Sequence, residues 1–216
     1  MRIPIHRVGW TFIGFFFAAN ILLFSISLWI GWAFVPLTLW CIAFFRDPER
    51  TAPAGEGLII SPADGRLLPV VHAPPPSELG MGSEPRLRLS IFMDVFNVHV
   101  NRIPSSGTVV ALSYRKGRFF NAAFDKASEY NERMSIRIRV ERPGGPEDLA
   151  VVQIAGLIAR RIKCDLIQGQ QVLRGERFGI IRFGSRLDVY LPPGAQVLAV
   201  PNQHTRAGET ILARLR

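Results

Sequence analysis

The stretch Phe178-Gly179-Ile180-Ile181-Arg182-Phe183-Gly184-Ser185-Arg186-Leu187-Asp188-Val189-Tyr190-Leu191 contains two apolar runs with a Gly-Ser pair between them. Both runs, 178–183 and 187–191, are rich in β-branched and aromatic residues, which favour extended strands. A small, flexible pair between two such runs is typical of a chain that passes from one strand to the next. The stretch therefore predicts that this part of the protein is built from β-strands.

The Gly184-Ser185 pair is also a place where a chain can cleave itself. The serine hydroxyl attacks the preceding carbonyl and turns the amide into an ester, and β-elimination then leaves dehydroalanine, which hydrolyses to an N-terminal pyruvoyl group. This ketone can form a Schiff base with an amine and withdraw electrons from the attached carbon, as pyridoxal phosphate does. A Gly-Ser dipeptide alone is more often a plain turn, so the chemistry depends on the other segments.

Short apolar runs separated by Gly, Pro and Asn fill the chain after Arg50, and some alternate with period two, as Ser135–Val140 does. Loops are expected at Ala73–Pro85 and Arg142–Asp148, and a helical turn or loop at Ala122–Asn131. The patterns predict a mainly β class, a β-sandwich or barrel-sandwich-like domain, with strands at Gly57–Ile60, Arg66–Val71, Leu87–Met93, Thr108–Tyr114, Met134–Val140, Leu149–Ile162, Phe178–Phe183, Leu187–Leu191, Gln196–Val200 and Thr210–Ala213.

An uncharged, apolar segment runs from Val8 to Phe45. It is too long and too aromatic for the core of a secretory signal. One membrane span needs about 20 apolar residues, and a pair of spans needs nearly 40. The segment therefore predicts two short membrane-associated helices, roughly Trp10–Leu28 and Trp32–Phe45, with Gly31 and Pro36 as possible break points.

Charges around this segment favour a hairpin with both ends on the same side. By the positive-inside tendency these ends are cytoplasmic, because arginines flank the segment on both sides: Arg2, Arg7, Arg46 and Arg50. The expected organisation is a membrane-associated segment, residues 1–46, and a domain of residues 47–216 that faces the cytoplasm at the cell (inner) membrane. One tilted span with the domain outside is the alternative.

The net charge of +9 favours anionic membrane lipids as partners. Nucleic acid is the other common partner of basic proteins, but the arginines are scattered and a membrane segment accompanies them, so no nucleic-acid partner is expected. Cys41 and Cys164 are the two cysteines, and neither belongs to a metal-ligand spacing. Both are expected to be buried and apolar in character.

Six segments, taken in order, resemble those of the phosphatidylserine decarboxylase proenzymes, specifically their short (type A), pyruvoyl-dependent subfamily. The resemblance runs from about Phe44 to the C-terminus. Each segment alone is modest, but six in this order are highly specific. They are Phe44–Arg50, Ser61–Gly65, Phe92–Gly107, Asn121–Arg133, Gln153–Gly156 and Phe183–Ser185.

The resemblance implies cleavage between Gly184 and Ser185, which would give a β chain of residues 1–184 and an α chain of residues 185–216. Ser185 would become the pyruvoyl group, with no pyridoxal phosphate and no metal. The substrate would be phosphatidylserine, and the products phosphatidylethanolamine and carbon dioxide. The two chains would form an αβ heterodimer, with a higher oligomer left open. A related serine-headgroup lipid, such as an archaeal ether lipid, is an alternative substrate.

The resemblance also implies a serine-histidine-aspartate arrangement, in which Asp64 orients a histidine that deprotonates the Ser185 hydroxyl. By itself, an Asp before a Gly serves to shape a turn. His99 is the candidate histidine, because His6, His72 and His204 lie before the membrane segment, beside a proline-rich loop and in a C-terminal turn.

One position departs from the long-form members, which carry two histidines three residues apart. Aligned on Pro104 and Gly107, His99 matches the first, which is associated with decarboxylation. Arg102 stands in place of the second, which is paired with the serine in self-cleavage. Either His99 serves both steps or Asp64 acts through a water.

Two other classes of function compete with this interpretation. A non-enzymatic, membrane-anchored β-sandwich adaptor would explain the hydrophobic segment, but adaptors usually carry a heptad-patterned helical hairpin, and Gly184-Ser185 stays unexplained. A basic β domain that binds nucleic acid would show strongly salt-dependent binding.

Overall fold

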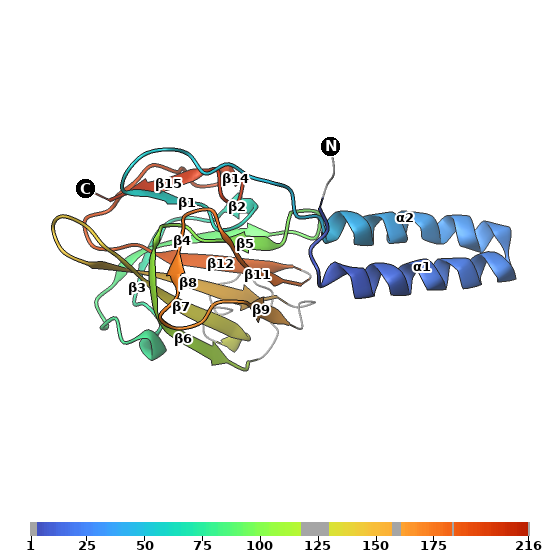
Figure 1. Ribbon diagram of the computed structural model, residues 1–216, viewed down its shortest axis with the longest axis horizontal. Helices are drawn as coiled ribbons and strands as arrows, with labels where there is room; N and C mark the ends of the chain where they lie inside the picture. The colour runs from blue at the N-terminus through green and yellow to red at the C-terminus, as the bar shows by residue number, and fades with distance from the viewer. Residues whose placement is uncertain (1–3, 118–129, 157–160, 183, 216) are drawn as a thin grey trace. The chain divides into compact units, whose positions relative to one another are not determined.

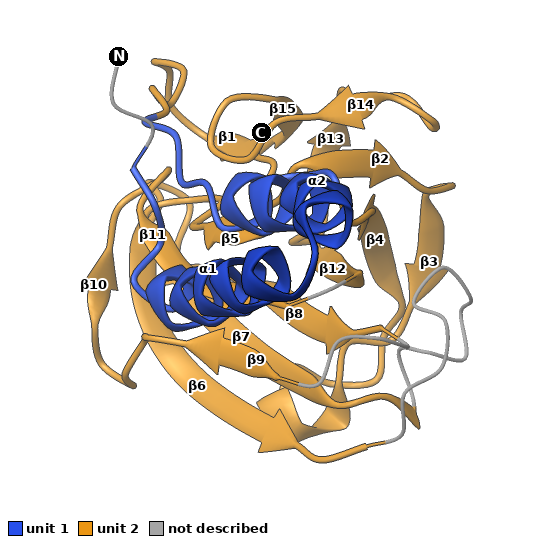
Figure 2. Cartoon of the chain, turned by 90° about the vertical axis from the view of Figure 1, so that its right-hand side faces the viewer, with its two compact units in different colours: residues 1–49, 96–98 blue, residues 50–95, 99–216 orange. Residues whose placement is uncertain are grey.

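The computed structural model describes residues 4–117, 130–156, 161–182 and 184–215, and the chain divides into two compact units (Figure 2). Unit 1 comprises residues 1–49 and 96–98, and unit 2 comprises residues 50–95 and 99–216. The segment predicted as a helical turn or loop, 122–131, lies almost wholly outside the described residues.

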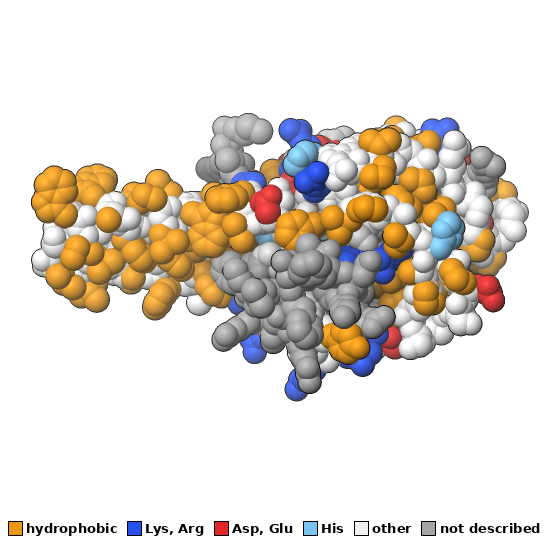
Figure 3. All heavy atoms as spheres, turned by 180° about the vertical axis from the view of Figure 1, so that it is seen from behind, with side chains coloured by type: hydrophobic (Ala, Val, Ile, Leu, Met, Phe, Trp, Pro, Cys, Tyr) orange, Lys and Arg blue, Asp and Glu red, His pale blue; other side chains and the backbone are white. Residues whose placement is uncertain are grey.

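Unit 1 contains two apolar helices, α1 (Gly9–Ile26) and α2 (Leu28–Phe44), which lie side by side (Figure 1). Apolar side chains cover the visible face of this pair (Figure 3). By length and composition α1 could cross a membrane, while α2, with 17 residues, is slightly shorter. The predicted helical hairpin is therefore confirmed.

The break between the helices lies at Ser27, whose backbone is extended (φ −159°, ψ 131°), rather than at Gly31 or Pro36. Both of these residues lie inside α2. A Cβ on Gly31 would come within 2.2 Å of the Phe24 ring, and the side chain of Asn20 donates a hydrogen bond to the Gly31 carbonyl (3.0 Å). Gly31 thus allows the two helices to approach closely.

Unit 2 is built from antiparallel strands, so the predicted mainly β class is confirmed. The strands are β1 (Leu58–Ile60), β2 (Gly65–Leu67), β3 (Val71–Ala73), β4 (Arg86–Met93), β5 (Val100–Arg102), β6 (Gly107–Arg115), β7 (Arg133–Val140), β8 (Glu147–Ala155), β9 (Ile162–Cys164), β10 (Gln171–Val172), β11 (Arg177–Ile181), β12 (Ser185–Tyr190), β13 (Gln196–Val197), β14 (His204–Thr205) and β15 (Ile211–Arg214). A short 3₁₀ helix, η1 (Ser77–Leu79), lies in the predicted loop 73–85.

The large sheet has the order β10-β6-β7-β8-β12-β4-β2-β14, with β3 also paired to β4. Two three-stranded sheets have the orders β1-β15-β13 and β5-β11-β9. Apolar side chains from all three sheets form one core, and a second, smaller cluster lies where η1 and Met81 cover part of the large sheet. Strand β12 lies between β8 and β4, so its backbone is paired on both edges.

Two predicted strands are divided in the structure. The run Arg66–Val71 becomes β2 and β3, because Pro69 has no N–H to give to a ladder. The run Leu149–Ile162 becomes β8, which ends at Ala155, and β9, which begins at Ile162.

Candidate active site

Ser185 is the first residue of β12 and is fully buried. It pairs with Met93 of β4 on one side and with Ala155 of β8 on the other. Its hydroxyl is 3.9 Å from the Met93 sulfur, a weak acceptor. Because successive side chains of a strand alternate between faces, Ser185 shares the core face of the sheet with Leu187 and Val189.

Gly184 carries the carbonyl that Ser185 would attack. Its backbone is left-handed (φ +67°), and a Cβ there would meet nothing within 4 Å. Glycine is therefore favoured at position 184 by its left-handed backbone conformation, and not because a side chain would clash there. The Gly184 carbonyl oxygen accepts a hydrogen bond from the Gly156 N–H at 3.1 Å.

A buried group of neutral polar side chains surrounds Met93. The Asn101 amide lies 3.8 Å from the Met93 sulfur, and the Gln153 amide donates to the Asn101 side-chain oxygen at 2.8 Å. Asn101 and Gln153 are both fully buried. The Gln153 oxygen has no hydrogen-bond partner among the described residues, so this group retains an acceptor that a ligand could use.

Asp64 lies in the turn just before β2. Its two carboxylate oxygens accept from the Ala207 N–H (2.7 Å) and from the Arg50 guanidinium (3.1 Å), and Arg50 also contacts Glu209 (3.2 Å). The Asp64 side chain is thus held between a backbone N–H and a guanidinium.

Sheet register brings the Asp64 turn to the same end of the large sheet as Ser185. Arg66 of β2 pairs with Phe92 of β4, so Gly65 lies beside Met93, which in turn pairs with Ser185. A Cβ on Gly65 would fall 2.2 Å from the Phe92 carbonyl oxygen, so this close approach needs glycine.

His99 is fully buried and directly precedes β5. Its carbonyl accepts from the N–H of Ile181 (3.4 Å), four residues before Ser185. The backbone of His99 is thus bound to the last residue of β11, the strand that precedes Ser185 in the chain.

Arg102, which stands where long-form members are expected to have a histidine, is directed into the turns around it. Its guanidinium donates to the Gly175 carbonyl (2.9 Å), and its Cδ lies 2.8 Å from where a Cβ of Gly208 would be. These contacts give Arg102 a packing role.

The opposite face of β12 carries charge. Arg186 and Asp188 are both fully buried and form an ion pair with Nε–Oδ1 2.6 Å and Nη2–Oδ2 3.0 Å, and Arg88 lies 3.9 Å from Asp188. Burial, and secondarily the negative charge of Asp188, raise the pKa of Tyr190 on the same face.

Comparison with known proteins places the chain in a family. The family described as phosphatidylserine decarboxylase matches residues 37–213. The chain is 56% identical to the phosphatidylserine decarboxylase proenzyme of Paramagnetospirillum magneticum, over 98% of this chain and 87% of that protein. It is 54% identical to the proenzyme of the same name from Cereibacter sphaeroides, over 98% of this chain and 90% of that protein.

The chain belongs to the phosphatidylserine decarboxylase family. A third proenzyme of this name, from Ruegeria pomeroyi, is 52% identical over 99% of this chain and 96% of that protein. The predicted resemblance is therefore confirmed, and the protein is an enzyme of this kind.

Several residues in or next to the candidate site were given no individual role from the sequence: Met93, Asn101, Gln153, Gly156 and Asn131, whose side chain donates to the Ala155 carbonyl. All lie within the segments that carry the family resemblance. One signal was available for Gln153, because it is the single amide in the otherwise apolar run Leu149–Ala155.

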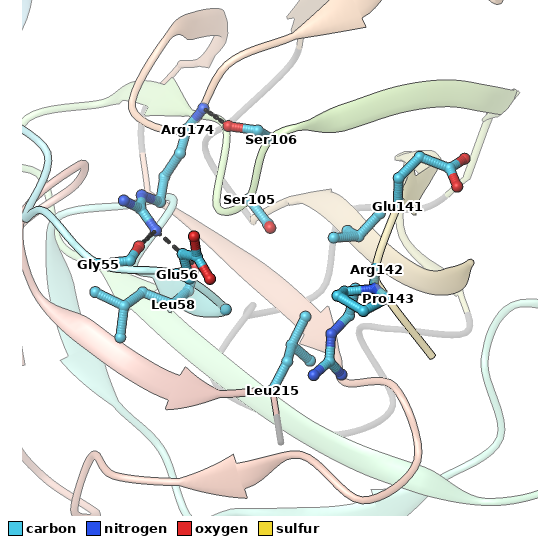
Figure 4. A pocket seen from close by; sticks show the side chains of 12 residues that line it. Gly55, Glu56, Leu58, Ser105, Ser106, Glu141, Arg142, Pro143, Arg174 and Leu215 are labelled. Carbon is cyan, nitrogen blue, oxygen red and sulfur yellow. Dashed lines mark hydrogen bonds between the residues drawn. The ribbon is translucent and has the colours of Figure 1, made fainter. Parts of the chain in front are cut away.

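A pocket of about 630 Å³ elsewhere in unit 2 is lined by residues that include Ser105, Arg142 and Arg174 (Figure 4). The Arg174 guanidinium is bound to the backbone, since it donates hydrogen bonds to the carbonyls of Pro53, Gly55 and Leu58. None of Asp64, His99 and Ser185 lines this pocket.

Proposed function

We propose that this protein cleaves itself between Gly184 and Ser185 and then converts phosphatidylserine to phosphatidylethanolamine and carbon dioxide. The observation that carries the proposal is Ser185 itself. In a chain of this family, it is a fully buried serine at the start of a central strand, preceded by a glycine whose carbonyl is held in place.

Self-cleavage needs groups of the chain and one molecule of water. The Ser185 oxygen adds to the Gly184 carbonyl carbon, the C–N bond breaks, and the Ser185 nitrogen takes a proton, which leaves an ester. Loss of the Ser185 Cα proton then breaks the Cβ–Oγ bond and releases Gly184 as a carboxylate. Hydrolysis of the remaining dehydroalanine releases ammonia and leaves the pyruvoyl group.

Asp64 and His99 are the proposed assistants. A base must take the hydroxyl proton of Ser185, and Asp64 lies at the same sheet end as that serine. His99 adjoins the β11–β12 junction through its backbone, and we assign it to proton transfer in self-cleavage, in decarboxylation or in both.

The surroundings of Ser185 fit a ketone at that position. Met93 gives it an apolar wall, and the amides of Asn101 and Gln153 are neutral, so no fixed charge among them opposes an incoming amine. The pyruvoyl group would supply an electron sink for loss of carbon dioxide from an amine-bearing substrate. Absence of a metal and of pyridoxal phosphate stays a prediction.

The apolar hairpin supports membrane association, which suits a substrate that stays in the bilayer. A site held at the interface gains effective concentration without further contacts. We propose attachment to the cell (inner) membrane with unit 2 in the cytoplasm. The β chain 1–184 and α chain 185–216 would remain together as an αβ pair.

Intact-mass measurement of the purified protein under denaturing conditions tests this proposal. We expect two chains, with the smaller one beginning in pyruvoyl at position 185, instead of one chain of 24.1 kDa. Ser185→Ala should give a single chain without decarboxylase activity. Ser90→Ala, which removes another buried strand serine, is the matched control and should be cleaved. A single wild-type chain that releases no carbon dioxide would reject the proposal in favour of a non-enzymatic adaptor.

A further inference from the structure

The peptide unit between Ala155 and Gly156 forms a hydrogen bond on each side, one through its carbonyl and one through its N–H. On one side, the fully buried Asn131 side chain donates to the Ala155 carbonyl oxygen at 2.8 Å. On the other side, the Gly156 N–H donates to the Gly184 carbonyl oxygen at 3.1 Å. Because a peptide unit is planar, a hydrogen bond to its carbonyl fixes the direction of its N–H. Asn131 therefore helps to direct the Gly156 N–H toward the carbonyl oxygen of Gly184, the residue that Ser185 would attack.

The Gly184 oxygen is the atom on which negative charge develops when Ser185 attacks. A donor already in place on that oxygen stabilises the transition state more than the ground state, because a hydrogen bond to an anion is stronger than one to a neutral carbonyl. Chains of hydrogen bonds also polarise one another. The bond from Asn131 should thus make the Gly156 N–H a better donor.

The surroundings hold this donor in a fixed position. Ala155, the last residue of β8, pairs directly with Ser185, and its own N–H donates to the Glu132 carbonyl at 2.9 Å. Residues 149–155 of β8 are buried throughout. Because the donor is already in place, little reorganisation is needed as charge develops.

We propose that the Gly156 N–H is the oxyanion donor of self-cleavage and that Asn131 is its positioning residue. This inference rests on the proposed self-cleavage at Gly184–Ser185. It concerns the acyl shift, in which the amide becomes an ester, and not the later elimination, in which Gly184 leaves as a carboxylate.

The sharpest test replaces one backbone atom. Cell-free synthesis into lipid nanodiscs can place glycolate at position 156, which turns the amide into an ester and removes only the N–H. The first-order appearance of the small chain is followed by denaturing mass spectrometry. We expect cleavage about 10²–10³-fold slower than in the wild type, as for the loss of one oxyanion donor.

A matched control separates this effect from a weakened strand. Val152 pairs with Asp188 in the same β8–β12 ladder, so the hydroxy-acid analogue of valine at position 152 removes a backbone donor from the same strand. It should leave the rate within about threefold, as expected for a bond remote from the reacting carbonyl. Equal slowing at both positions, or a rate within threefold for the glycolate protein, would overturn the inference.

Asn131→Ala gives a second, genetically accessible test. It should slow cleavage about tenfold, and hydroxylamine, which cuts a preformed ester, should not restore the rate. Restoration by hydroxylamine would show that the acyl shift is intact and would overturn the role of Asn131. The wild-type chain tests the proposed function separately. If it never cleaves, self-processing itself is rejected.

Discussion

The two faces of strand β12 bury polar groups of opposite kinds. On the face of Ser185, the side chains of Asn101 and Gln153 are neutral amides that contact each other, and Asn101 and Ser185 both contact Met93. On the other face, Arg186 and Asp188 form a fully buried ion pair. The comparison indicates a division of labour within one strand. The charged face fixes the strand, while Met93, Asn101 and Gln153 on the neutral face carry no charge of their own.

The largest expected effect comes from breaking the charged face. Asp188→Asn removes the carboxylate that pairs with the buried Arg186 guanidinium and should lower the free energy of unfolding by about 3–5 kcal/mol. Thermal and urea unfolding should be measured in detergent in the Ser185→Ala background, so that one chain unfolds.

An exposed ion pair serves as the control for this prediction. Lys163 and Asp165 are 3.3 Å apart with side chains 36% and 40% exposed, and Asp165→Asn should change the free energy of unfolding by less than about 1 kcal/mol. Equal losses for Asp188→Asn and Asp165→Asn would contradict the stabilising role of the charged face.

The neutral face should respond differently. Gln153→Leu removes the donor to Asn101, leaves a buried amide oxygen unsatisfied, and should cost about 2 kcal/mol in the same unfolding measurement. The double variant Asn101→Leu/Gln153→Leu removes both partners and should recover most of that stability. If the double variant is as unstable as the sum of the single variants, the two amides do not act as a pair.

The smallest expected effect is on the pH dependence of unfolding. On the face of the sheet that carries Arg186, the Glu78 side chain accepts hydrogen bonds from Arg133 (Nε–Oε1 2.8 Å) and from Ser135 (2.9 Å). Burial acts to raise the pKa of Glu78, but these hydrogen bonds and the Arg133 charge outweigh it and lower the pKa. A lowered folded-state pKa contributes stability above the unfolded pKa of about 4.3, which is lost as pH falls through the folded value.

Glu78→Gln should therefore lower the free energy of unfolding by about 1.5 kcal/mol at pH 7 and flatten its decline in acid. Unfolding of the Ser185→Ala chain between pH 7 and pH 3 measures both. Glu84→Gln, at an exposed position, should keep the wild-type profile. A steep acid decline that persists in Glu78→Gln would assign the acid sensitivity to other carboxylates.

Local patterns predicted much of this architecture. The apolar segment predicted two helices, and alternation predicted most of the strands. The position of the helix break was wrong, because Gly31 is used for packing against Phe24 and Ser27 takes the extended conformation instead. No local pattern distinguishes a glycine that breaks a helix from one that lets another helix approach.

The sequence offers candidate site residues where motifs are short and gives none where contacts are long-range. Ser185 and Gly184 are neighbours in sequence and could be recognised together. Asn131 reaches Ala155 across 24 residues, and Gln153 reaches Asn101 across 52. Such contacts follow from sheet register, which depends on the pairing of whole strands.

The position of Ser185 at the first residue of β12 has a consequence for the history of the molecule. A cut there would leave the small chain as an inserted strand, paired on both edges by β4 and β8 of the large chain, with β14 and β15 paired to β2 and β1. Assembly of the uncut chain is unimolecular, whereas reassembly after denaturation would require two molecules to meet. The mature enzyme would therefore be folded once, as a precursor, and its lifetime would be set by the rate of unfolding rather than by an equilibrium.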